Sequence, residues 1–400
     1  LRGLARRVAE IAALPEMEER RRLWRAHNSL RPARPMMLIF PEGSWGELLP
    51  GSALQCEEEQ ARGIERDLRM RIYAFEHFRS DNVVEAEWVV GKAIHNSGWG
   101  VAPRRRPSTA ARGAWKFDPV IETPADLEKI TSPRISHDEV ESARRLDFFQ
   151  DLFGGILAVK LKGISHISFH LMNQYTALRG LEEVMVDMYA EPAMLHDALA
   201  RLEEGHHRVV RQYVEQNLLS LNNDNTYHSS GGNGYTDELP VPGFDPERVR
   251  PCDLWASAEA QELAGVSPEQ HLEFSLQYEK RLLAPFGLNG YGCCENLTLK
   301  LGDVLTLPNI RRISIAPHAS VDACAGVLGK RAIFSWKPQP ADLVGDFNTE
   351  RIRAYIRHTI EVTRGCVLEM ILKDTHTCEN RPERFDIWTQ IAREEIERAA

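Results

Sequence analysis

Cysteine, histidine and carboxylate side chains gather in two short polar segments of the sequence. Cys293, Cys294 and Glu295 stand together in one segment, and His376 and Cys378 stand two residues apart in the other. Thiolate, imidazole and carboxylate groups are ligands that zinc prefers, and a zinc site with an open position suits catalysis. A single cysteine is more often a small buried apolar residue, so this prediction depends on the two segments meeting in the fold.

Within this group, the predicted ligand pair is Cys294 and Cys378, followed by His376. Cys293 and Glu295 rank lower as ligands. Neighbouring residues of an extended segment point in opposite directions, so Cys293 and Cys294 are not expected to reach the same ion. We expect about one zinc ion per chain, with an open or water-filled position.

Both segments follow predicted strands in a chain that alternates strands with helices. Strands of this kind, separated by helices, predict a parallel sheet, and eight of them favour a closed (β/α)8 TIM barrel. An open sheet is disfavoured because no dinucleotide-binding glycine motif is present. The expected barrel is one domain over residues 1–400, with an N-terminal helical extension over 1–34. Nine strand-like segments are the candidates for these eight strands: 36–40, 82–90, 156–161, 167–170, 218–221, 283–288, 310–315, 331–334 and 367–372.

Long polar loops should carry the chemistry, because in such a barrel function lies in the loops at the C-terminal face, after the strands. The loop over residues 222–234 is rich in Asn, Ser and Gly. Turn formation explains that composition, and so does contact with a substrate. We predict Asn223, Asp224 and His228 as catalytic residues of this loop. The candidate substrate-binding residues are Glu42, Trp45, Asn222, Tyr227, Tyr291 and His318.

Composition excludes several classes of protein. The chain has 400 residues, 43% of them hydrophobic, and a net charge of -9 from well-mixed charges. Such a chain does not resemble a nucleic-acid binder, and no apolar run approaches the roughly 18 residues of a membrane span. Seven cysteines without an export signal favour reduced thiols, so we expect a cytoplasmic protein without a membrane partner.

Short segments in the same order over about residues 120–395 resemble motifs of the uroporphyrinogen-decarboxylase-like superfamily. They are GLE at 180–182 with DMY and EP within 187–192, WAS at 255–257 with VSPEQHLEFS at 266–275, GKR at 329–331, and KPQPADL at 337–343. This resemblance implies the (β/α)8 barrel fold.

The resemblance favours the methyltransferases of the superfamily over its decarboxylases. Residues 40–45 read FPEGSW where true decarboxylases carry arginines for a polyanionic substrate. Cys294-Glu295-Asn296 is similar to the Cys-Gly-Asn motif of corrinoid-linked methyltransferases, although Gly292 stands where their zinc-binding histidine would be. The resemblance therefore implies a zinc-dependent O-demethylase methyltransferase, which moves a methyl group from a small donor, such as an aryl methyl ether, to a corrinoid protein.

Two other functions remain open from the sequence. One is a metal-free decarboxylase-like enzyme or lyase that uses Asp224 and His228 as polar catalysts. The other is a non-catalytic binding protein on the same barrel, which the polar, ligand-rich loops disfavour. Metal content separates the first alternative from the methyltransferase. A homodimer is compatible with the sequence.

Overall fold

The computed structural model describes residues 1–107 and 116–399 and has a parallel sheet of seven strands at its centre. The strand order is β1-β15-β14-β13-β12-β11-β8, so strands that follow one another in the chain are neighbours, and the first lies beside the last. The strands are β1 (Met36–Ile39), β8 (Ser168–Phe169), β11 (Trp255–Ala258), β12 (Leu288–Tyr291), β13 (Ile310–Ile315), β14 (Ile333–Trp336) and β15 (Val367–Leu372).

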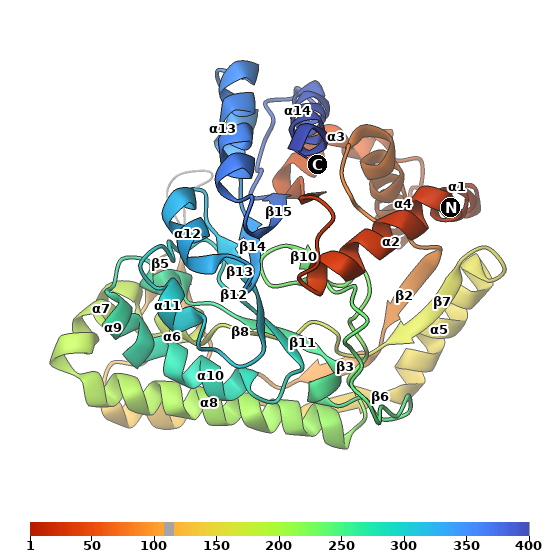
Figure 1. Ribbon diagram of the computed structural model, residues 1–400. Helices are drawn as coiled ribbons and strands as arrows, with labels where there is room; N and C mark the ends of the chain where they lie inside the picture. The colour runs from red at the N-terminus through yellow and green to blue at the C-terminus, as the bar shows by residue number, and fades with distance from the viewer. Residues whose placement is uncertain (108–115, 400) are drawn as a thin grey trace.

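Helices cover the outer face of this sheet, which explains why strands such as β15 are mostly apolar, with Glu369 as the one charged residue of that strand. Every residue of β15 is buried, as expected for a parallel strand covered on both faces. Figure 1 shows the longest helix, α8, along the lower side of the molecule and α13 and α14 at the top. The covering helices include α6 (Leu171–Arg179), α8 (Pro192–Glu215), α9 (Pro268–His271), α10 (Gln277–Leu283), α11 (Leu301–Val304), α12 (Val321–Leu328), α13 (Thr349–Val362) and α14 (Glu383–Ala399).

Short pieces of chain fill the side between β1 and β8. The backbone N–H of Asp81 donates to the Met37 carbonyl in β1 (2.8 Å), so the segment that contains Asp81 runs beside that strand. Leu219 forms a single parallel bridge with Ile164. A separate parallel pair, β2 (Glu87–Gly91) and β7 (Ala158–Lys162), lies on this side with α5 (Glu139–Phe153), at the right of Figure 1. Among the described residues, no strand ladder joins β8 to β1.

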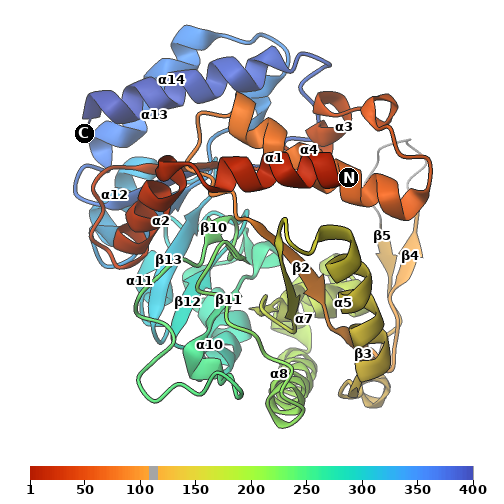
Figure 2. The same cartoon turned by 90° about the vertical axis from the view of Figure 1, so that its right-hand side faces the viewer.

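The N-terminal extension is two helices rather than one, because Pro15 starts a second helix after the first has ended at Ala12. Figure 2 shows α1 crossing the front of the molecule beneath α13 and α14. Its apolar residues Ala5, Val8 and Ile11 are buried at helical spacing. The remaining helices are α1 (Arg2–Ala12), α2 (Pro15–Asn28), α3 (Trp45–Leu48), α4 (Glu59–His77) and α7 (Leu181–Ala190).

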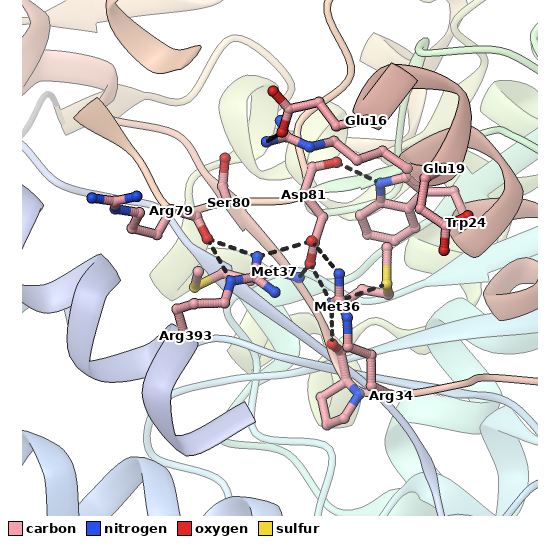
Figure 3. Close-up of polar contacts among 12 residues, drawn as sticks. Glu16, Glu19, Trp24, Arg34, Met36, Met37, Arg79, Ser80, Asp81 and Arg393 are labelled. Atoms are coloured by element: carbon pink, nitrogen blue, oxygen red, sulfur yellow. Dashed lines mark hydrogen bonds and ion pairs between the residues drawn. The ribbon is translucent and has the colours of Figure 1, made fainter. Parts of the chain in front are cut away.

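A buried carboxylate fastens both ends of the chain to the start of the sheet. Asp81 is 2% exposed, and it accepts hydrogen bonds from Arg34 (2.7 and 3.0 Å), from Arg393 in α14 (2.8 Å) and from the Met37 N–H (2.8 Å). Figure 3 shows these donors converging on Asp81, with the Trp24 indole donating to its carbonyl. This network lies at the amino end of β1, away from the carboxyl ends of the parallel strands.

Most predicted strands are confirmed, but 218–221 forms only the bridge at Leu219, and 82–90 is a strand only from Glu87. The strands predicted over 310–315 and 367–372 have those bounds. The strand predicted over 283–288 is wrong, because α10 continues to Leu283 and β12 starts only at Leu288. In the segment predicted as a loop over 95–118, two short strands pair, β4 (Arg104–Arg106) and β5 (Lys116–Asp118), while residues 108–115 lie outside the described residues. No described helix is long and apolar enough to cross a membrane.

Candidate active site

The loop over residues 222–234 packs against the sheet instead of covering it as a surface lid. It forms a small hairpin of β9 (Tyr227–His228) and β10 (Gly232–Asn233), and residues 230–236 are buried. Its glycines allow this approach. A Cβ on Gly231 would meet the Ile371 side chain of β15 at 2.4 Å, and one on Gly232 would meet the Arg312 guanidinium of β13 at 2.0 Å. The hairpin therefore needs glycine where it contacts β13 and β15.

A buried ion pair between β13 and β15 contacts the hairpin. Arg312 is 1% exposed, and its Nε donates to Glu369 Oε1 of β15 at 2.9 Å. Its Nη2 donates to the Asn233 carbonyl at 3.1 Å. Arg312 and its other neighbours lower the pKa of Glu369 against the opposing effect of burial, so this carboxylate stays charged.

Two thiols meet above the hairpin, just beyond the carboxyl end of β12. The Sγ atoms of Cys293 and Cys294 are 3.6 Å apart, and the Ser230 hydroxyl lies 3.4 Å from Cys293 Sγ. The expectation that these thiols point apart is wrong. The segment bends after Gly292, which has a φ of 90°, so it is not extended. The hydrogen bond from Cys294 lowers the pKa of Cys293 to about 6, and the charge of Lys373 acts in the same direction.

Lys373 places a positive charge close to the thiol pair. It directly follows β15, and its Nζ lies 3.4 Å from Ser230 Oγ, 3.7 Å from Asp374 Oδ1 and 3.9 Å from Glu42 Oε1. Its pKa is raised despite burial, because anionic groups surround it. Asp374 Oδ2 lies 3.8 Å from Cys294 Sγ, so the loops after β12 and β15 do converge.

Acidic groups also stand at the carboxyl ends of β11 and β12, and a histidine stands at the end of β8. The His170 ring is hydrogen-bonded to Glu259, and each residue directly follows its strand. Glu295 is buried and accepts from the backbone N–H groups of Cys293 (2.7 Å) and Ala260 (3.3 Å). Burial and the charge of Glu259 raise the pKa of Glu295 to about 7. All these groups share one edge, because the carboxyl ends of parallel strands lie together.

The ligand set expected from the sequence is not assembled. Cys378 is buried elsewhere, where its Sγ donates to Glu47 of α3 at 3.1 Å. His376 is exposed, and the Glu295 carboxylate is engaged with backbone N–H groups. Within residues 1–107 and 116–399, no group of three His, Cys, Asp or Glu side chains is arranged to hold a metal ion. Of the five predicted ligands, only Cys293 and Cys294 bring their sulfurs together.

The three predicted catalytic residues form contacts that stabilise the conformation of the loop over residues 222–234. Asn223 Nδ2 donates to the Leu239 carbonyl at 2.7 Å, and Asp224 is paired with Lys162. His228 is buried against the Trp255 ring, with its Nε2 2.9 Å from the Asn222 carbonyl, and burial lowers its pKa to about 3. Asp224 also lines a cavity of about 420 Å³ between this loop and the β2–β7 pair.

The predicted substrate-binding residues divide into three groups. Glu42 and Tyr227 lie around Lys373, near the thiols. His318 is exposed, and its carbonyl accepts from Asn296 (3.2 Å). The others pack into the protein. Trp45 contacts Tyr73 and Phe78, Asn222 bonds to the Trp255 backbone, and the Tyr291 hydroxyl donates to Glu279 (2.9 Å).

Sequence reasoning missed several residues of this edge. His170, Glu259, Lys337 and Asp374 were not selected, although each stands within two residues of a strand's carboxyl end. That position is the signal that could have found them. Ser230 could not be found in this way, because its approach to Cys293 depends on the path of the hairpin.

Comparisons with known proteins find likenesses among solved structures. No family model and no curated protein matches the chain. A solved structure described as a methyltransferase from Methanosarcina mazei is similar with a TM-score of 0.49 and 13% identity, over 94% of this chain and 97% of that chain. A likeness at this level establishes neither a shared family nor a shared activity.

Proposed function

We propose that this chain is a (β/α)8-barrel enzyme that transfers methyl groups, with Cys293 and Cys294 at its centre. The observation that carries the proposal is the meeting of these two thiols, 3.6 Å apart, with Asp374 across from Cys294. They stand at the carboxyl ends of the strands, where barrel enzymes place their chemistry. Thiolates are soft donors that bind zinc, and zinc as a Lewis acid would activate the heteroatom that carries the methyl group as a leaving group.

The strand order supports the barrel. β1 pairs with β15, and the pairing continues from strand to strand as far as β8. Among the described residues, the ladder that would close the barrel is missing only between β8 and β1. Val83 and Val84 are buried and follow Asp81, whose N–H donates to Met37 of β1. We propose this short segment as the remaining strand of the wall, with the hairpin of β9 and β10 filling the interior.

The thiol pair has the spacing of two zinc ligands. Two sulfurs about 2.3 Å from one tetrahedral ion lie about 3.8 Å apart, close to the separation of Cys293 and Cys294. Asp374, 3.8 Å from Cys294 Sγ, would become a third protein ligand after a small side-chain movement. Zinc held by these three side chains would act as a Lewis acid on the methyl-bearing heteroatom and leave a position open for it. Cys378, His376 and Glu295 are not part of this proposed set.

The surrounding residues would assist the departure of the methyl group. As the bond between the methyl carbon and its heteroatom breaks, the electron pair stays on the heteroatom. The Lys373 ammonium stands beside this position and would stabilise the developing negative charge. The Ser230 hydroxyl, 3.4 Å from both Lys373 Nζ and Cys293 Sγ, would hold the cation and the thiol in place. We propose a corrinoid protein as the methyl acceptor.

The metal-free lyase is less well supported by the same geometry. It required Asp224 and His228 as catalysts, but Asp224 is paired with Lys162 and His228 is buried beneath the loop. Neither side chain joins the thiols at the carboxyl edge of the sheet.

A transfer assay tests the proposal. Purified protein loaded with zinc is mixed with cob(I)alamin and a panel of aryl methyl ethers, methylamines and methyl thioethers, and methylcobalamin is followed by absorbance. We expect transfer from at least one donor, its loss in Cys293→Ser and in Cys294→Ser, and its retention in Cys252→Ser, a matched change at another free cysteine. Equal rates in all four proteins, or no transfer from any donor, would contradict the proposal.

A further inference from the structure

A buried lysine stands at the same edge of the sheet as the thiols. Lys337 directly follows β14 and is 2% exposed. Its Nζ donates to the hydroxyl (2.8 Å) and the carbonyl (3.0 Å) of Ser335, two residues back in the chain. Lys373 follows the neighbouring strand β15, which pairs in parallel with β14. Nothing in the proposed methyl transfer uses the Lys337 amine.

This amine has no carboxylate partner. In the described part of the chain, no ion pair within 4.0 Å joins a carboxylate to Lys337 Nζ, although buried charged side chains of proteins are usually paired. Glu369 is the acid whose charge acts most strongly on Lys337. Both carboxylate oxygens of Glu369 accept hydrogen bonds from Arg312, and His27 Nε2 lies 3.3 Å from Glu369 Oε2. A protonated Lys337 would therefore be a buried cation held only by neutral groups of Ser335.

The charges around Lys337 favour its neutral form. Burial lowers its pKa to about 7, and the cations Lys373 and Arg312 act in the same direction, while Glu369 and Cys293 oppose them. At neutral pH roughly half of the amine is then uncharged, about 10³-fold more than for an ordinary lysine with a pKa near 10.4. A desolvated lysine beside a second cation is an arrangement that makes the amine nucleophilic.

We propose that Lys337 is a second reactive group of this edge, an amine that condenses with the carbonyl carbon of a small keto acid or aldehyde acid to form an imine. The nitrogen lone pair adds to the carbonyl carbon. The carbonyl oxygen leaves as water with two protons, and a C=N bond remains. Lys373, the neighbouring cation, would pair with the carboxylate of the ligand. This activity goes beyond methyl transfer and uses neither thiol.

Reductive trapping tests the proposal directly. The full chain is incubated at pH 7 with glyoxylate and cyanoborohydride, and the reduced adduct is mapped by peptide mass spectrometry against time. We expect Lys337 to be labelled at least tenfold faster than Lys330, an exposed lysine close to it in sequence. The Cys293→Ser variant should be labelled at least as fast as the wild-type protein, because Cys293 opposes the lowering of the Lys337 pKa, and this separates the result from the outcome of the methyl-transfer assay.

Two matched variants check the assignment. Lys330→Met should leave the labelling of Lys337 unchanged, and Lys337→Met should abolish only the rapid phase. If Lys337→Met does not fold, the time course of the wild-type protein still decides the question. Labelling of Lys337 that is absent, or no faster than that of Lys330, would overturn the proposal.

Discussion

Replacement of Asp81 by Asn should separate the stability of this fold from its chemistry. The change keeps an oxygen for the Met37 N–H but removes the negative charge between Arg34 and Arg393, which are 19% and 14% exposed. Breaking a buried ion pair by removing one partner costs about 3–5 kcal/mol. Because both arginines reach some solvent, we expect about 3 kcal/mol, the lower end of that range. Methyl transfer per folded molecule should not change, since Asp81 lies at the amino end of β1.

Urea unfolding at pH 7 measures this loss, with Glu16→Gln as the control. Glu16 is an exposed partner of Arg20, and such surface pairs contribute about 0–1 kcal/mol. Burial opposes ionisation of Asp81, but Arg34 and Arg393 lower its pKa below the ordinary value. Its contribution is therefore present above about pH 4, the unfolded pKa, and is lost as the pH falls through the lower folded value. A loss under about 1 kcal/mol at pH 7, or a difference between the proteins that persists unchanged at pH 2, would refute this reasoning.

Three further changes distinguish the roles of residues near the site. Cys378→Ser should leave zinc binding, measured by metal analysis, unchanged, because this thiol bonds to Glu47 and does not reach Cys294; a loss of metal would restore it as a ligand. Gly232→Ala should lower the free energy of unfolding by about 1–3 kcal/mol, because its Cβ would collide with Arg312, and a neutral effect in urea titrations would refute the close packing of the hairpin. His228→Gln should weaken the pH dependence of stability: burial lowers the pKa of His228 to about 3, so the wild-type protein loses stability as the pH falls below about 6.5, where the unfolded histidine takes up a proton. Parallel stability curves for the wild-type protein and His228→Gln between pH 7 and pH 4 would argue against that assignment.

The parallel sheet could be predicted from the sequence because its strands are mostly buried segments, rich in apolar residues, between helices. Residues 310–315 and 367–372 lie in a covered sheet, so burial on both faces leaves a direct trace in the sequence. The start of β12 could not be located, because residues 283–288 are equally apolar at the end of a buried helix. Periodicity does not separate these two environments over so short a run.

The candidate site was predicted only in part. The polar segment at Cys293 and Cys294 was found from its residue types, but the bend after Gly292, which turns both thiols to one side, leaves no pattern in the sequence. Cys378 carries the same residue type and lies in a different environment, beside Glu47. His228 was predicted as a loop catalyst, and the sequence did not show that it packs against the Trp255 ring in the interior. For the thiol pair, for Cys378 and for His228, the environment of the side chain depends on contacts between segments that are far apart in the sequence.

X-ray absorption at the zinc edge tests the central claim most directly. The protein is loaded with one equivalent of zinc, and the number of sulfur ligands is determined for the wild-type protein, Cys293→Ser, Cys294→Ser and Cys378→Ser. The account predicts two sulfur ligands at about 2.3 Å in the wild-type protein and in Cys378→Ser, and fewer in each of the other two variants. Zinc with no sulfur ligand, or a sulfur ligand lost only in Cys378→Ser, would contradict the assignment of the Cys293–Cys294 pair as the centre of this site.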